Sequence, residues 1–161
     1  MNILDFAINM EKEGAKYYGE QAELNKNNSL NPVCLMLQTD ELNHIRILTN
    51  VLNNLPYELK DSITITKAKS LFSGVGNLKI EEIGVLSQLD FYTIASGKEK
   101  ESIDLYAGLL AKAADEKEKE LYTYLMNQEK KHFEIIDGLV SLLRLAHEWV
   151  ESAEFGTRKE Y

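Results

Sequence analysis

The stretches Glu41–His44 (ELNH) and Glu129–His132 (EKKH) carry the same pattern, Glu-x-x-His, and they lie 88 residues apart. The same shift places Glu11 on Glu99, so each of these histidines also has a glutamate 33 residues before it. The chain contains only three histidines, and two of them occupy these matching positions. Glutamate and histidine pairs that recur in this way predict a site for two metal ions.

The repeat extends beyond these residues and indicates a helical hairpin that occurs twice. Residues 3–53 and 91–141 are identical at nine positions related by the shift: Ala7/Ala95, Glu11/Glu99, Lys12/Lys100, Glu13/Glu101, Tyr18/Tyr106, Leu37/Leu125, Glu41/Glu129, His44/His132 and Ile47/Ile135. Two prolines and long runs of helix-favouring residues predict an all-α chain. A short turn within each hairpin and a long connection between them predict a ferritin-like four-helix bundle, with one long crossover between helices 2 and 3.

Turn-forming residues set the expected limits of the first hairpin. The first helix is expected over about residues 2–24 and stops in the polar run 25–29. Asn31 is expected to be the N-cap of the second helix, with Pro32 in its first position. That helix should end near residue 53, before Pro56, the one proline of the crossover.

The second hairpin, about residues 91–154, is less clearly marked, because no glycine or proline separates its helices. We expect a third helix over about 89–113 and a fourth from Asp115 or Glu116 to about residue 154, where Asp115 and Glu118 could form a capping box. A structureless crossover over 56–88 would be unusually long for a compact domain. Short helices are therefore expected inside it, at 67–72 and 79–83.

Helical periodicity places the acidic residues on the faces that should point into the bundle. Glu11 and Glu99 interrupt apolar stripes of the first and third helices, formed by Ile3, Ala7, Gly14, Tyr18 and Ala22 and by Phe91, Ala95, Ser102 and Tyr106. The second and fourth helices carry matching faces: Leu37, Glu41, His44 and Leu48, and Leu125, Glu129, His132 and Ile136. Residues equally distant from the turn of a hairpin lie side by side, so all six polar groups are expected in one layer.

Four carboxylates buried in one layer repel one another and are costly to desolvate, and two divalent cations would cancel that charge. Mixed imidazole and carboxylate ligands suit iron or manganese better than calcium or structural zinc. We therefore expect two iron ions, with manganese or zinc able to occupy the same site. The expected ligands are Glu11, Glu41, His44, Glu99, Glu129 and His132.

Two tyrosines also repeat, at positions two helical turns beyond the first and third glutamates. Tyr18 and Tyr106 could be ordinary core residues whose hydroxyls find a partner. The interpretation we favour is that their hydroxyls bond ligating carboxylates across the bundle and so orient them.

The composition limits the kinds of partner that the chain can bind. Its 161 residues suit one domain, 1–161, and the net charge of −8 disfavours nucleic acid and anionic membranes. The N-terminal residues lack the basic and apolar regions of a secretory signal, so a cytoplasmic protein is expected. The single cysteine, Cys34, is expected to be a small buried apolar residue.

These residues together resemble the rubrerythrin-like branch of the ferritin-like di-iron proteins, from about Ile3 to Leu143. The resemblance implies that Glu41 and Glu129 bridge two metals. It also implies that Glu11 and Glu99 are terminal ligands and that each histidine completes one metal shell. The two repeated tyrosines match family positions that hydrogen-bond the ligands.

The chain departs from the rubrerythrin pattern in two respects. Rubrerythrins proper end in a rubredoxin domain with four cysteines, whereas this chain has one cysteine. Electrons would then come from a separate donor such as a rubredoxin-like protein. Rubrerythrins also carry a further glutamate three residues after the third-helix ligand, where this chain has Ser102. That difference puts the family's redox-linked movement of one iron in doubt.

Three functions are consistent with this sequence. The leading hypothesis is a di-iron oxidoreductase that reduces hydrogen peroxide or dioxygen, and the resemblance implies a homodimer. The alternatives are a ferroxidase or iron-handling protein, and a structural module that metal ions hold together.

Overall fold

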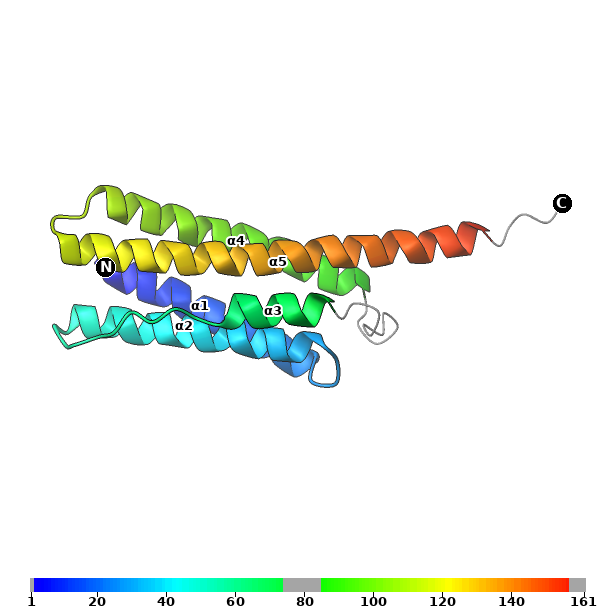
Figure 1. Cartoon of the computed structure of the whole chain (residues 1–161), viewed down its shortest axis with the longest axis horizontal. Coiled ribbons are helices and arrows are strands. Elements are labelled where there is room, and N and C mark those ends of the chain that lie inside the picture. The colour runs from blue at the N-terminus through cyan, green and yellow to red at the C-terminus, as the bar shows by residue number, and fades with distance from the viewer. Residues whose placement is uncertain (1, 74–84, 157–161) are drawn as a thin grey trace.

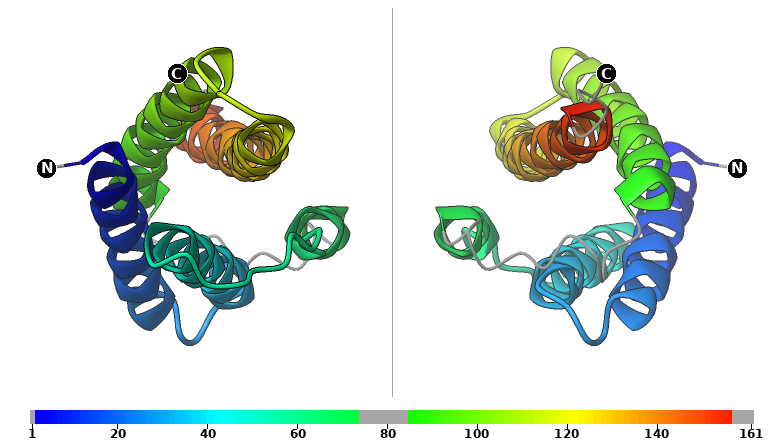
Figure 2. Two further views of the ribbon diagram at one scale, coloured as in Figure 1. Left: turned by 90° about the vertical axis from the view of Figure 1, so that its left-hand side faces the viewer. Right: turned by 90° about the vertical axis from the view of Figure 1, so that its right-hand side faces the viewer.

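The computed structural model describes residues 2–73 and 85–156. These residues form five helices and no strand: α1 (Ile3–Leu24), α2 (Leu30–Leu52), α3 (Thr64–Ser73), α4 (Val85–Ala111) and α5 (Glu116–Gly156). The two hairpins are α1 with α2 and α4 with α5, while α3 lies against both α2 and α5 (Figures 1 and 2). The predicted fold class is confirmed: the bundle is all-helical, and its long connection runs between the two hairpins.

Polar side chains determine where α1 begins. Asn2 is its N-cap, and the Asn2 side chain accepts a hydrogen bond of 2.6 Å from the backbone N–H of Leu4. In return, the carboxylate of Asp5 accepts a bond of 3.3 Å from the backbone N–H of Asn2. This reciprocal capping box satisfies N–H groups that a helix start leaves without partners.

The prediction that Asn31 caps α2 was wrong, because α2 begins at Leu30. The side chain of Asn28 accepts a hydrogen bond of 2.9 Å from the backbone N–H of Leu30 instead. Asn31 turns back toward the first helix and donates a bond of 2.7 Å to the carbonyl of Ala22. Ser29 occupies the cap position without a side-chain hydrogen bond, Asn28 supplies that bond, and Asn31 satisfies a carbonyl in the last turn of α1.

The crossover is shorter than expected because α4 starts at Val85, four residues before the predicted Leu89. The helix predicted at 67–72 is present as α3, whereas the piece predicted at 79–83 lies outside the described residues. At the start of α5, Asp115 accepts a hydrogen bond of 2.9 Å from the backbone N–H of Glu118. Glu118 in turn accepts from the N–H of Ala114 at 2.8 Å, one residue away from a regular capping box.

Two buried apolar clusters enclose the polar layer from either end of the bundle. One includes Leu30, Leu37, Tyr92, Ile136 and Leu139, and the other includes Ile47, Leu48, Tyr106, Leu121 and Leu125. Each buried aliphatic side chain stabilises the fold by about 1.5–3 kcal/mol. The predicted stripes are too long at one end, since Ile3 is 47% exposed and Phe91 is 38% exposed.

Helix α5 is the longest element, and its C-terminal part projects beyond the other helices (Figure 1). Leu145 and Trp149 lie on this part and are 63% and 75% exposed. Among the described residues, no helix combines the length and the apolar composition needed to span a membrane.

Candidate metal centre

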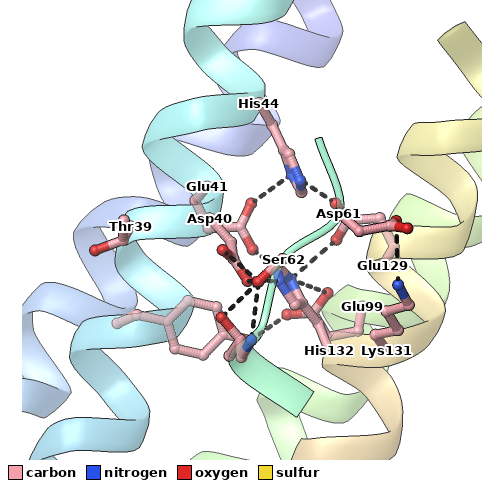
Figure 3. A network of polar contacts seen from close by, with 12 residues as sticks. Thr39, Asp40, Glu41, His44, Asp61, Ser62, Glu99, Glu129, Lys131 and His132 are labelled. Carbon is pink, nitrogen blue, oxygen red and sulfur yellow. Dashed lines mark hydrogen bonds and ion pairs between the residues drawn. The ribbon is translucent and has the colours of Figure 1, made fainter. Parts of the chain in front are cut away.

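All six predicted ligands lie in one buried cluster between the helices. None of these six residues is more than 4% exposed, and they come from four helices: Glu11 from α1, Glu41 and His44 from α2, Glu99 from α4, and Glu129 and His132 from α5. Figure 3 shows most of this cluster, with the two histidines pointing into the space between α2 and α5. Their rings are stacked, with centroids 5.6 Å apart.

The cluster divides into two groups of four residues, each able to hold one metal ion. One group is Glu11, Glu41, His44 and Glu129, and the other is Glu41, Glu99, Glu129 and His132. Within each group, one ligand atom from every residue lies within 4.8 Å of the others. Glu41 and Glu129 belong to both groups, so only these two carboxylates could contact both ions.

The two oxygens of each shared carboxylate face different histidines. Glu41 Oε2 lies 3.6 Å from His44 Nδ1, and its Oε1 lies 3.0 Å from His132 Nδ1. Glu129 shows the converse arrangement, with Oε2 at 3.6 Å from His132 Nδ1 and Oε1 at 2.9 Å from His44 Nδ1. This geometry is the one required of a carboxylate that bridges two cations.

The remaining two glutamates each serve one group and each meet a tyrosine from the other hairpin. Glu11 Oε2 is 3.3 Å from His44 Nδ1, and its Oε1 accepts a hydrogen bond from the hydroxyl of Tyr106. Glu99 Oε2 is 3.8 Å from His132 Nδ1, and its Oε1 accepts from the hydroxyl of Tyr18. Each tyrosine therefore holds one carboxyl oxygen of its glutamate, and the other oxygen of that glutamate faces a histidine.

Without metal ions, proton uptake reduces the repulsion between the four carboxyl groups. Burial raises the pKa of Glu11 and Glu99 well above the usual carboxyl value, and the charges of Glu129 and Glu41 raise it further. For Glu41, burial acts in the same direction, but a hydrogen bond from Glu11 and the imidazoles outweigh it and lower the pKa. The two terminal carboxyls therefore bind protons more readily than ordinary carboxyl groups.

The imidazoles respond in the opposite way to the shared carboxylates. Burial would lower the pKa of His44 and His132, but the surrounding carboxylates outweigh burial and raise the pKa of both well above the usual value. For Glu129, the same imidazoles outweigh burial and the charge of Glu41, so its pKa is lowered. The raised pKa of each histidine favours the imidazolium form, whose positive charge offsets that of the shared carboxylates.

Two buried polar atoms of the cluster lack a hydrogen-bond partner, as expected of atoms that bind cations. His132 Nδ1 and Glu129 Oε1 are both buried without a hydrogen-bond partner, although each lies at ion-pair distance from other members of the cluster. A buried polar atom without a partner is costly unless something else occupies the space that it faces. Nitrogen and oxygen donors converging in this way suit iron, manganese or zinc.

Sequence reasoning missed Asp40, which contacts the cluster from outside. Asp40 Oδ2 lies 3.0 Å from His132 Nε2, on the far side of the ring from the other ligands (Figure 3). Asp40 is not part of the repeat, because the position 88 residues later is Gln128. The available signal was that Asp40 directly precedes Glu41 on the helix.

A cavity of about 60 Å³ opens beside the cluster between α1 and α4. Glu11, Glu41 and Glu99 line it, together with the small residues Gly14 and Ser102. A Cβ atom added at Gly14 would lie 3.4 Å from Cδ of Glu41, so the glycine leaves space directly over a shared carboxylate. The cavity is large enough for water-sized molecules.

Comparison with known proteins identifies one family. The family model described as rubrerythrin matches residues 2–140, which include every residue of the cluster and both tyrosines. None of the curated proteins and none of the solved structures that were compared matches the chain.

Proposed function

Because the chain belongs to the rubrerythrin family, we propose that it is a di-iron oxidoreductase that reduces hydrogen peroxide or dioxygen. The observation that carries the proposal is the division of each shared carboxylate between two histidines. Glu41 and Glu129 each direct one oxygen to His44 and the other to His132. This arrangement supports two ions held close together, as a two-electron reduction requires.

In this proposal, each ion takes four protein ligands. His44, Glu11, Glu41 and Glu129 would hold the first ion, and His132, Glu99, Glu41 and Glu129 would hold the second. Four carboxylates and two divalent cations sum to zero charge, which is why a site this deeply buried can be stable when loaded.

A bound ferrous pair would supply two electrons, which with two protons would reduce hydrogen peroxide to two waters. The protein would bind the ions, orient the substrate and exclude bulk water from the site. The hydroxyls of Tyr18 and Tyr106 hold one oxygen of Glu99 and one of Glu11, and both hydroxyls can supply protons to these carboxyl groups. The cavity between α1 and α4 admits the substrate beside Glu41.

A reductant outside this sequence would have to restore the ferrous state. The 161 residues contain one cysteine, Cys34, which is fully buried, so they hold no four-cysteine iron site. The proposal therefore includes a separate electron donor.

Rapid mixing tests this proposal. Protein loaded anaerobically with two ferrous ions per chain is mixed with hydrogen peroxide, and the near-ultraviolet absorption of ferric iron is followed. We expect oxidation at a stoichiometry of one peroxide for two irons. Absence of oxidation, or oxidation no faster than that of free ferrous ion, would refute the proposal. Accumulation of many more than two ferric ions per chain in a large hollow particle would support the iron-handling alternative instead.

A further inference from the structure

The two histidines of the cluster differ in what contacts them from behind. The Nδ1 atom of His132 faces the glutamates, whereas its Nε2 atom lies 3.0 Å from Oδ2 of Asp40. The Asp40 side chain is only 13% exposed, so water screens this contact weakly. The imidazole of His132 is thus held between the cluster and a carboxylate outside it.

Asp40 is itself held in place by the crossover. The hydroxyl oxygen of Ser62 lies 2.9 and 2.8 Å from the two carboxylate oxygens of Asp40. Ser62 also accepts a hydrogen bond of 3.1 Å from the backbone N–H of Thr64, the first residue of α3. The segment before α3 therefore fixes the carboxylate that contacts His132, as Figure 3 shows.

The other half of the repeat lacks this carboxylate. The position equivalent to Asp40 is Gln128, whose side chain is 1% exposed and whose Nε2 atom has no hydrogen-bond partner. Within the described part of the chain, every ion pair recorded for His44 uses its Nδ1 atom, with Glu11, Glu41 or Glu129. A negative charge thus lies behind only one of the two rings.

A carboxylate behind a ligating histidine has a defined effect on metal binding. It accepts the Nε2 proton, so the lone pair stays on Nδ1 and points at the ion. It also fixes the ring orientation and increases the electron density on the ligating nitrogen. Loss of such a partner typically weakens metal binding about 10- to 100-fold.

We infer that Asp40 is a positioning residue that makes the His132 position the tighter of the two metal positions, with the crossover as its support. The inference rests on the metal pair in the proposed function, but not on its reaction with peroxide. It concerns the affinity of each position and therefore has a test that needs no turnover.

Stepwise binding of cobalt(II) to metal-free protein provides that test. Native mass spectrometry counts the ions, calorimetry gives the two dissociation constants, and the visible absorption of cobalt reports the ligand field of the ion that binds first. We expect two unequal constants in the unchanged protein. In Asp40→Asn the smaller dissociation constant should increase about tenfold or more, so the two dissociation constants should become more similar. The absorption spectrum of the cobalt ion that binds first should also change.

Asp61→Asn is the matched control. It removes the same charge from the crossover close to the site, but Asp61 is exposed and pairs with Lys131 rather than with a histidine. Asp61→Asn should leave both dissociation constants within about twofold of those of the unchanged protein. Ser62→Ala keeps the charge of Asp40 but removes the hydroxyl that holds its carboxylate. This variant should weaken binding of the first cobalt ion by a smaller factor than Asp40→Asn does.

The inference is overturned if Asp40→Asn leaves both constants unchanged or weakens both by the same factor. It is also overturned if Asp61→Asn has the same effect as Asp40→Asn. Two bound cobalt ions with equal, unaffected constants would refute this inference alone. Failure of the unchanged protein to bind two ions would refute the proposed function as well. Circular dichroism of each metal-free variant verifies that the helices are intact.

Discussion

Oε1 of Glu41 lies 3.0 Å from Nδ1 of His132 on the opposite hairpin, closer than the 3.6 Å between Oε2 of Glu41 and Nδ1 of His44 in its own Glu-x-x-His pair. The two pairs are therefore not two separate sites. Each supplies a carboxylate to the histidine of the other, and the hairpins are joined through the cluster.

Removal of a shared carboxylate should affect both metal positions. We predict that Glu129→Gln binds at most one iron or zinc ion per chain after dialysis, because both groups lose an anionic ligand. Glu11→Gln should weaken metal binding at one of the two positions only, because Glu11 belongs to one group. Elemental analysis measures the metal content, and Glu101→Gln serves as a control because Glu101 is exposed. Two retained ions in Glu129→Gln would contradict the assignment of this residue as a bridge.

Metal binding should release protons. The pKa values of Glu11, Glu99, His44 and His132 are all raised, so the metal-free cluster binds protons readily, and two divalent ions must displace a measurable number of them on binding. Calorimetry of zinc binding in buffers with different ionisation enthalpies measures this number. A release near zero would show that the metal-free site is not neutralised by protons.

The metal-free protein should lose stability as pH rises. A raised pKa means that the folded state binds more protons than the unfolded state, so the contribution of His44 and His132 is present below about pH 6.5 and is lost as pH rises through their folded-state values. Thermal unfolding from mildly acidic to alkaline pH should show a falling Tm. The zinc-loaded protein, whose ligands are already deprotonated, should show a much smaller decrease. An equal decrease in both forms would exclude the cluster as the cause.

The two tyrosines should contribute similarly to stability. Tyr18→Phe and Tyr106→Phe each leave a buried carboxyl oxygen without its donor, so each should lower the free energy of unfolding of the metal-free protein by about 1–3 kcal/mol. Urea denaturation measures the change. Tyr17→Phe is the control, because Tyr17 bonds the carbonyl of Phe91 outside the cluster. Unchanged stability in both cluster variants would show that these hydrogen bonds contribute little.

The cavity between α1 and α4 should control access to the site. Ser102→Leu places extra carbon atoms in a space of about 60 Å³ without removing a predicted ligand. We expect the ferrous-loaded variant to retain two ions and to react with hydrogen peroxide about tenfold more slowly, as measured by rapid mixing. A full rate in Ser102→Leu would indicate that peroxide enters by another route.

Much of this architecture was predictable because the sequence contains the same helical hairpin, with the same ligands, twice. The 88-residue shift identified Glu11, Glu41 and their repeat partners, and helical periodicity placed them on buried faces. The residues that break the repeat could not be found in this way. Asp40 contacts His132 across the bundle and Ser62 in the crossover, and both are long-range contacts that a search for repeated residues does not reveal.

Helix limits were predicted less well where several residues could serve the same purpose. Asn31 has the residue type and position of a cap, but Asn28 forms the hydrogen bond and Asn31 is used by the preceding helix. Propensity identifies candidates for a cap, and packing of the two helices decides between them.

The most direct measurement is anomalous diffraction from crystals of the iron-loaded protein. We predict two iron peaks, both within bonding distance of the carboxylates of Glu41 and Glu129, with one peak beside His44 and the other beside His132. A single peak, or two peaks that share neither carboxylate, would contradict the account.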